Sequence, residues 1–145
     1  MTVQLLTPEG MFGPVPYHHV SISAGARQVH VAGQIARDAE GNPVATGDLA
    51  GQIAHALRST ARGLAGAGAT FADVVRLRFF LTRWSPDKYP EFIAGIERVA
   101  DELGIPQPLP PLSAIGVDCL FEPDVLVEIE ADAVIDWGSG GSTEG

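Results

Sequence analysis

The chain has 145 residues, of which 46% are hydrophobic and 19% charged, and this balance indicates a single globular domain rather than a disordered chain. Its formal charge of -9 and its nine scattered Lys and Arg residues argue against a nucleic-acid partner, because phosphate binding requires clustered basic side chains. No apolar run reaches the length of a membrane span, and the first ten residues lack the pattern of a signal peptide. We therefore expect a cytoplasmic protein with no membrane partner.

The sequence contains no pattern typical of a cofactor or metal site. A P-loop, a Rossmann glycine pattern and a Cys/His zinc spacing are all missing, so we expect neither a cofactor nor a metal. His18 and His19 are adjacent, and on a strand they would face opposite ways. The single Cys119 excludes an internal disulfide, and we expect it to be a small buried apolar residue.

The first half of the chain predicts two strands and a helix. Residues 1–16 are rich in Pro and Gly and should wrap the surface, whereas residues 17–23 and 28–35 read as strands that form a hairpin. A polar loop leads to Asp48, a good N-cap for a helix over residues 49–66. His55 falls on the polar side of this helix, where we expect it to be exposed.

The next segments predict a strand over residues 73–82 and a second helix. Alternation places Val75, Leu77, Phe79 and Leu81 on one face of the strand and Val74, Arg76, Arg78 and Phe80 on the other. The mixed face indicates either a polar covering, such as another subunit, or an open solvated surface. Ser85 should cap the second helix, whose buried stripe would include Tyr89 and Phe92.

Two final strands, over residues 112–117 and 125–135, complete the order β-β-α-β-α-β-β. We expect a single domain over residues 1–136. The Gly/Ser-rich tail, residues 137–145, should fray. Two helices can cover only one face of such a sheet. Glu128 and Glu130 share a face of the last strand. They are either solvated or ion-paired carboxylates, or a carboxylate kept in a cleft for acid–base chemistry.

This order and five short motifs resemble the reactive-intermediate deaminase (RidA/YjgF) family over residues 17–135. The motifs are Pro16-Tyr17, Val31-Ala32-Gly33-Gln34-Ile35, the helix with Gln52, Asp73-Val74-Val75 before Phe80-Leu81-Thr82, and Leu126-Val127-Glu128-Ile129-Glu130-Ala131. The resemblance implies an α+β, chorismate-mutase-like fold with a mixed sheet, two helices on one face, and a homotrimer around a central barrel. It also implies small-molecule clefts between subunits.

The resemblance further assigns roles to individual residues of such a cleft. Tyr17 matches the family's cleft tyrosine, Gly33 the glycine whose backbone approaches the ligand, and Glu128 the carboxylate that positions the attacking water. Family members that hydrolyse 2-imino acids carry Pro-Ala-Arg-Ser, whose Arg binds the substrate carboxylate. Here Pro110-Pro111-Leu112-Ser113 stands in its place, followed by Ala114 where the family often has Cys.

Leu112 cannot bind a carboxylate, so the resemblance predicts an altered substrate unless Arg78 or Arg83 substitutes. One hypothesis is an enzyme in which Glu128 and Tyr17 act on an imine, enamine or related reactive molecule, with Gly33, Leu112, Ser113 and Ala114 in contact with it. The alternative is a non-catalytic small-molecule-binding protein. A third, the ribonuclease activity sometimes attributed to the family, conflicts with the acidic charge.

Overall fold

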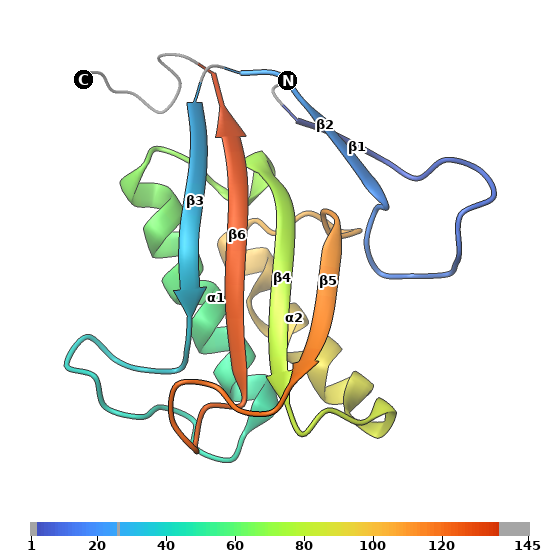
Figure 1. Ribbon diagram of the computed structural model, residues 1–145. Coiled ribbons are helices and arrows are strands. Elements are labelled where there is room, and N and C mark those ends of the chain that lie inside the picture. The colour runs from blue at the N-terminus through green and yellow to red at the C-terminus, as the bar shows by residue number, and fades with distance from the viewer. Residues whose placement is uncertain (1–2, 26, 137–145) are drawn as a thin grey trace.

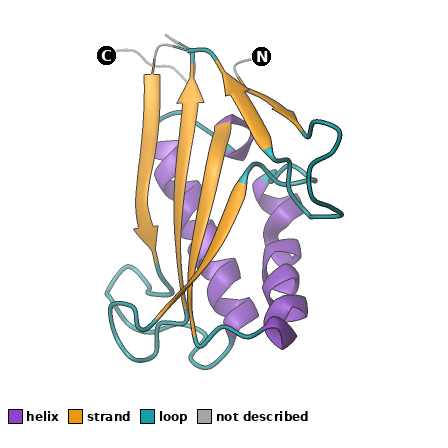
Figure 2. Ribbon diagram, turned by 45° about the vertical axis from the view of Figure 1, so that its right-hand side comes forward, coloured by secondary structure: helices purple, strands orange, loops and turns teal. Residues whose placement is uncertain are grey.

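The computed structural model describes residues 3–25 and 27–136, and its centre is a mixed four-stranded sheet (Figure 1). The strand order is β3 (Arg27–Gln34), β6 (Val127–Ile135), β4 (Val74–Thr82) and β5 (Leu112–Val117). β4 and β5 run parallel, and the other two pairs are antiparallel. Both long helices, α1 (Leu49–Gly66) and α2 (Tyr89–Leu103), lie on the same side of the sheet (Figure 2). The expected α+β architecture is confirmed.

The N-terminal strands pair differently from our expectation. β2 (Val20–Ser23) pairs with β1 (Val3–Leu6) in a separate two-stranded ribbon, so the predicted hairpin with β3 is wrong. β3 instead pairs with β6, roughly a hundred residues away. The Ser21 hydroxyl joins the ribbon to the main sheet by donating to the Val75 carbonyl at 2.9 Å. Turn residues indicate where a chain can reverse, but the burial of the whole sheet decides which strands pair.

The helices cover the sheet through apolar faces that meet at close range. The Asp48 carboxylate accepts a hydrogen bond from the Gly51 amide at 2.9 Å, which confirms the predicted N-cap of α1. Gly95 of α2 packs against α1 so closely that a Cβ there would lie 2.8 Å from the Ala50 carbonyl oxygen and from the Ile53 Cβ. The two helices therefore share an interface that admits no side chain at position 95.

Gln52 of α1 is a polar residue that is completely buried. Its amide nitrogen donates to the carbonyls of Ala45 and Asp124 at 3.3 and 3.0 Å, and its amide oxygen accepts from the Leu126 amide at 2.9 Å. All of these partners lie in the loops before α1 and β6. Gln52 thus ties α1 to the segment that leads into β6.

Alternation explains most, but not all, of the sheet. Val127, Ile129 and Ala131 of β6 are buried, while Glu128 and Glu130 point to the opposite face, as expected. In β4, the register shifts between Val74 and Arg76, and this bulge buries Val74 where simple alternation had selected Val75.

Several local expectations need correction. Ser85 opens a short 3-10 turn, η2 (Pro86–Lys88), and bonds to the Asp87 carboxylate, so α2 begins only at Tyr89. Tyr89 is 45% exposed rather than buried. His55 is half-buried because its Nε2 pairs with the Arg37 carbonyl at 2.8 Å, and Cys119 is an exposed free thiol.

Two further points concern the extent of the chain. Within residues 3–25 and 27–136, no helix combines the length and apolar character needed to cross a membrane. The frayed tail expected for residues 137–145 lies outside the described residues.

Candidate functional site

Glu128 lies near the start of β6 on the face of the sheet opposite α1 and α2 (Figure 2). It stands opposite Phe80 of β4, and its neighbours Val127 and Ile129 point into the core. The described part of the chain supplies its carboxylate with no hydrogen-bond or ion-pair partner. A carboxylate with free acceptor positions can bind and orient a water molecule or a ligand donor.

Gly33 makes room for this carboxylate. A Cβ at position 33 would overlap the Glu128 carboxylate and would lie 2.5 Å from its Cδ and 2.6 Å from its Cγ. The register of β3 against β6 shifts between Val31 and Gln34, so Gly33 lies in a bulge beside Glu128. The two predicted residues are therefore in contact, and the glycine allows the backbone to approach the carboxylate.

The neighbouring carboxylates on the same face are paired. Arg78 donates to Glu130 at 3.4 Å and to Asp132 at 3.2 Å, and Asp132 also pairs with His30 Nδ1 at 2.7 Å. Of the alternatives that the sequence left open for these carboxylates, ion pairing therefore applies to Glu130. Glu128, two residues earlier on the same face, remains outside this ionic cluster.

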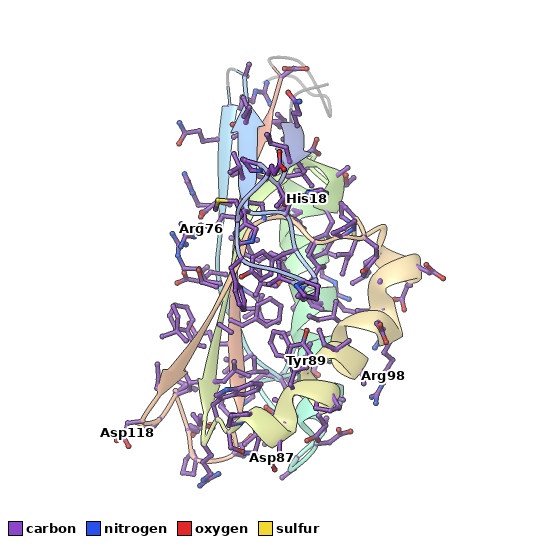
Figure 3. The ribbon with its side chains drawn as sticks, turned by 90° about the vertical axis from the view of Figure 1, so that its right-hand side faces the viewer. His18, Arg76, Asp87, Tyr89, Arg98 and Asp118 are labelled. Atoms are coloured by element: carbon purple, nitrogen blue, oxygen red, sulfur yellow. The ribbon has the colours of Figure 1, made fainter. Side chains whose placement is uncertain are left out.

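Tyr17, Leu112 and Ala114 lie on the helix side of the sheet instead. They line a pocket of about 490 Å³ at the edge formed by β5 and the start of α2. Tyr17 is held there by a bridge to Leu109, with the Leu109 amide donating to the Pro16 carbonyl at 2.9 Å. Figure 3 shows the two sides of the sheet: Arg76 projects on the open side, and Tyr89 lies with α2 on the other.

The Ser113 side chain lies on the opposite face of the sheet from Leu112 and Ala114, because side chains alternate along β5. Its hydroxyl accepts from Arg76 Nη2 at 3.2 Å, on the open face. The predicted residues therefore form two groups in one chain: Tyr17, Leu112 and Ala114 in the pocket, and Gly33, Ser113 and Glu128 on the open face. The sheet itself lies between them.

Neither arginine considered as a substitute anchor lines the pocket with Leu112. Arg78 is held on the open face by its two carboxylate partners. Arg83 adopts a positive φ of 52° and lines a different pocket beside Cys119 and Phe121, in the loop between β5 and β6. Among the residues that the structure describes, none that lines the Leu112 pocket is charged.

Four aromatic residues of the pocket, Phe12, Trp84, Tyr89 and Phe92, were not among the site residues that the sequence predicted. Phe12 lies in the N-terminal loop, where its carbonyl pairs with His19 Nε2 at 2.8 Å. Trp84 and Tyr89 flank the turn before α2. Helical periodicity assigned Tyr89 and Phe92 to the buried stripe of the second helix, and no local pattern marked Phe12 or Trp84 as site residues.

Ion pairs made by Arg37 stabilise the loop that leads to Glu128. Arg37 binds Asp124 through two hydrogen bonds, at 2.7 and 2.9 Å, and Glu122 at 2.5 Å. The hydrogen bonds from Arg37 hold the pKa of the Asp124 carboxyl below its usual range, and those carboxylates raise the pKa of Arg37. Among the described residues, no group of three His, Cys, Asp or Glu side chains could hold a metal ion.

Comparisons with known proteins agree with this architecture. Residues 13–135 match the family described as Endoribonuclease L-PSP. The chain is 31% identical over 134 residues to the 3-aminoacrylate deaminase RutC of Acinetobacter baylyi, an alignment that covers 92% of this chain and 98% of the relative.

Solved structures give the same result. YyfB of Yersinia pestis, described as a Rid-family protein of unknown function, is 35% identical with a TM-score of 0.81 over 93% of this chain and all of YyfB. Rv2704 of Mycobacterium tuberculosis, a member of the YjgF/YER057c/UK114 family, is 29% identical with a TM-score of 0.57 over 92% of this chain and all of Rv2704.

The mixed sheet with two helices on one face defines an α+β protein of the type seen in these relatives. The chain belongs to the RidA/YjgF/L-PSP family.

Proposed function

We propose that this protein hydrolyses imines or enamines that carry no carboxylate beside the reactive C=N group. Water adds to the imine carbon and ammonia leaves, so that R₂C=NH and H₂O give R₂C=O and NH₃. The relative RutC is named as a deaminase of 3-aminoacrylate, a compound whose name describes an enamine acid. The observation that carries the proposal is the Glu128 carboxylate, which has no partner in the described chain and lies against the backbone of Gly33.

The proposed site is shared between two copies of the chain in a homotrimer. Tyr17 and Leu112 face the helix side of the sheet and Glu128 faces the open side, so the three cannot surround one ligand within a single chain. The open face, which carries Phe80 and the partly exposed Ile115, is the face opposite α1 and α2. A neighbouring copy would cover this face and bring its own pocket to the Glu128 carboxylate.

In this arrangement Glu128 acts as general base or positions the attacking water, and the Tyr17 hydroxyl donates to the ligand. Leu112 leaves the pocket without a cation to bind a substrate carboxylate. Losing charged hydrogen bonds of this kind costs about 1.5–3 kcal/mol each, which is tenfold or more in binding. The substrate is therefore expected to differ from the 2-imino acids handled by relatives that carry the arginine.

The substrate assay compares two sources of imine. An amino-acid oxidase acting on alanine supplies 2-iminopropionate, and a flavin-dependent amine oxidase acting on primary amines supplies imines without a carboxylate. We expect accelerated ammonia release only with the second source. The Leu112→Arg variant should gain activity on 2-iminopropionate. Efficient turnover of 2-iminopropionate by the unmodified protein would show that another cation binds the carboxylate.

The role of Glu128 is tested against its neighbour on the same strand face. Glu128→Gln should abolish turnover with little change in melting temperature, because its carboxylate has no structural partner. Glu130→Gln should keep turnover, and its free energy of unfolding should fall by less than about 1 kcal/mol. Its ion pair with Arg78 is partly exposed, and Arg78 still pairs with Asp132 in the variant. Loss of function in Glu130→Gln alone would reverse the assignment. Ligand binding without turnover of any imine would make the protein a non-catalytic binder instead.

Assembly is tested by sedimentation equilibrium, which should give three times the chain mass of 15.2 kDa. A stable monomer would remove the shared cleft and the catalytic proposal with it.

A further inference from the structure

The pocket that contains Leu112 is built mainly from aromatic rings. Five of its ten lining residues are aromatic, the others are Pro, Val, Leu and Ala, and none is charged. Its volume of about 490 Å³ lies within the range of pockets that hold small organic ligands. The lining that one chain supplies therefore offers a ligand apolar contact area and no ionic partner.

The rings of Trp84 and Tyr89 pack on a buried aromatic floor, by which we mean Phe92 and Phe79. Phe92 is only 3% exposed and packs edge-on against Phe79, with ring centroids 5.0 Å apart. Trp84 meets Phe92 edge-on at 5.9 Å, and Tyr89 lies nearly parallel to Phe92, with an interplanar angle of 22°. Trp84 and Tyr89 remain 36% and 45% exposed. Because this floor orders both rings in advance, a ligand loses little additional side-chain entropy when it stacks on them.

The polar side-chain groups of the lining residues are uncharged and can donate hydrogen bonds. Within the described residues, the hydroxyls of Tyr17 and Tyr89 and the Trp84 Nε1 have no hydrogen-bond partner. They can donate to a neutral acceptor such as a carbonyl oxygen or an imine nitrogen. An anion would meet no cation here and would approach a chain of charge -9. A bound cation would lose hydration and gain only cation–π contacts from this lining, and if it paired with the Glu128 carboxylate that the proposed assembly brings to the pocket, it would occupy the base that hydrolysis requires.

We infer that this pocket binds an uncharged molecule that carries a planar ring, with the ring against Trp84 and Tyr89 and an acceptor near the Tyr17 hydroxyl. The inference rests on the proposed function and assigns its substrate class: a ring-bearing neutral imine or enamine. The ring takes the positioning role that a substrate carboxylate would otherwise have, because burial against fixed aromatic walls orients a ligand without an ionic anchor.

The binding test uses four stable probes. Phenylacetamide is neutral and has both a ring and a carbonyl acceptor. Phenylacetate replaces its amide by a negatively charged carboxylate, 2-phenylethylammonium replaces its amide by a positively charged group without an acceptor, and acetamide lacks the ring. In a Trp137→Phe background, Trp84 is the single tryptophan and its fluorescence reports on the pocket. Calorimetry on the unmodified protein provides the same affinities independently.

Phenylacetamide should bind at least about tenfold more tightly than each of the other three probes, and it should quench or shift the Trp84 emission. Equal or tighter binding of phenylacetate or 2-phenylethylammonium would overturn the neutral class. Equal binding of acetamide would overturn the role of the ring. Absence of phenylacetamide binding would overturn the pocket assignment.

Two variants test whether phenylacetamide binds in this pocket. Tyr89→Ala should weaken phenylacetamide about tenfold by calorimetry, because it removes one ring contact. Phe121→Ala is the matched control, since Phe121 is a 76% exposed aromatic residue outside this pocket, and it should leave the affinity unchanged. Equal effects of the two changes would show that the probe binds elsewhere.

Failure of this inference can be distinguished from failure of the proposed hydrolase. If the protein binds phenylacetamide but turns over no imine, the pocket assignment is supported and the proposed hydrolase activity is refuted. Turnover of carboxylate-free imines with no preference for ring-bearing ones, together with no phenylacetamide binding, supports the enzyme and overturns the pocket assignment.

Discussion

Replacing Gly33 by alanine should separate the function of this protein from its stability. The new Cβ would lie 2.5 Å from the Glu128 Cδ, whereas carbon atoms in ordinary contact are about 3.5 Å apart, so the carboxylate must move by about 1 Å. Misplacement of a reacting group by this amount can lower turnover about a hundredfold. Gly33 does not have a positive φ, so alanine fits the backbone, and the half-exposed Glu128 side chain can rotate away.

Stability should therefore change little. An alanine that fits the native backbone gains about 0.4–1 kcal/mol by restricting the unfolded chain, and this gain offsets the cost of moving a flexible side chain. The assay combines a thermal melt with ammonia release from carboxylate-free imines. Gly66→Ala, at the end of α1, is the control and should keep full turnover, because nothing lies within 4 Å of its new Cβ. Full turnover in Gly33→Ala would refute the claim that the position of the Glu128 carboxylate matters. Loss of both turnover and stability would place the effect in the fold instead.

Three further predictions concern stability. Gln52→Ala should lower the free energy of unfolding by about 2–4 kcal/mol in urea titrations, because it leaves the Leu126 amide without its partner and opens a cavity; a loss below about 0.5 kcal/mol would mean that water replaces the side chain. Gly95→Ala should lower the free energy of unfolding by about 1–3 kcal/mol, since its Cβ meets the backbone of α1. An unchanged melting temperature would mean that the two helices separate easily. Arg37 lowers the pKa of Asp124, so the unfolded chain binds more protons at this carboxyl than the folded chain does. The stability from this pair is complete above the unfolded pKa of about 3.9 and is lost as pH falls below it. Asp124→Asn should therefore flatten the acid limb of a stability–pH profile, and an unchanged limb would contradict the role of the pair.

The sequence by itself determined the local elements of this protein. The period of apolar residues and the Asp48 cap predicted α1 with its observed bounds, because a helix depends on contacts three and four residues apart. Strand alternation likewise predicted that Glu128 and Glu130 share a face opposite the buried Val127 and Ile129. The family motifs selected Gly33 and Glu128, which the structure brings into contact.

Only the tertiary structure decided how these elements combine. β2 pairs with β1 and β3 with β6, because strand partners are chosen by burial of the whole sheet rather than by the nearest turn. Helical periodicity assigned Tyr89 to the core, but the late start of α2 leaves its ring exposed beside Trp84. The pocket draws on the N-terminal loop, the turn before α2 and β5, so its aromatic lining follows from contacts between segments far apart in the chain, which no local pattern encodes.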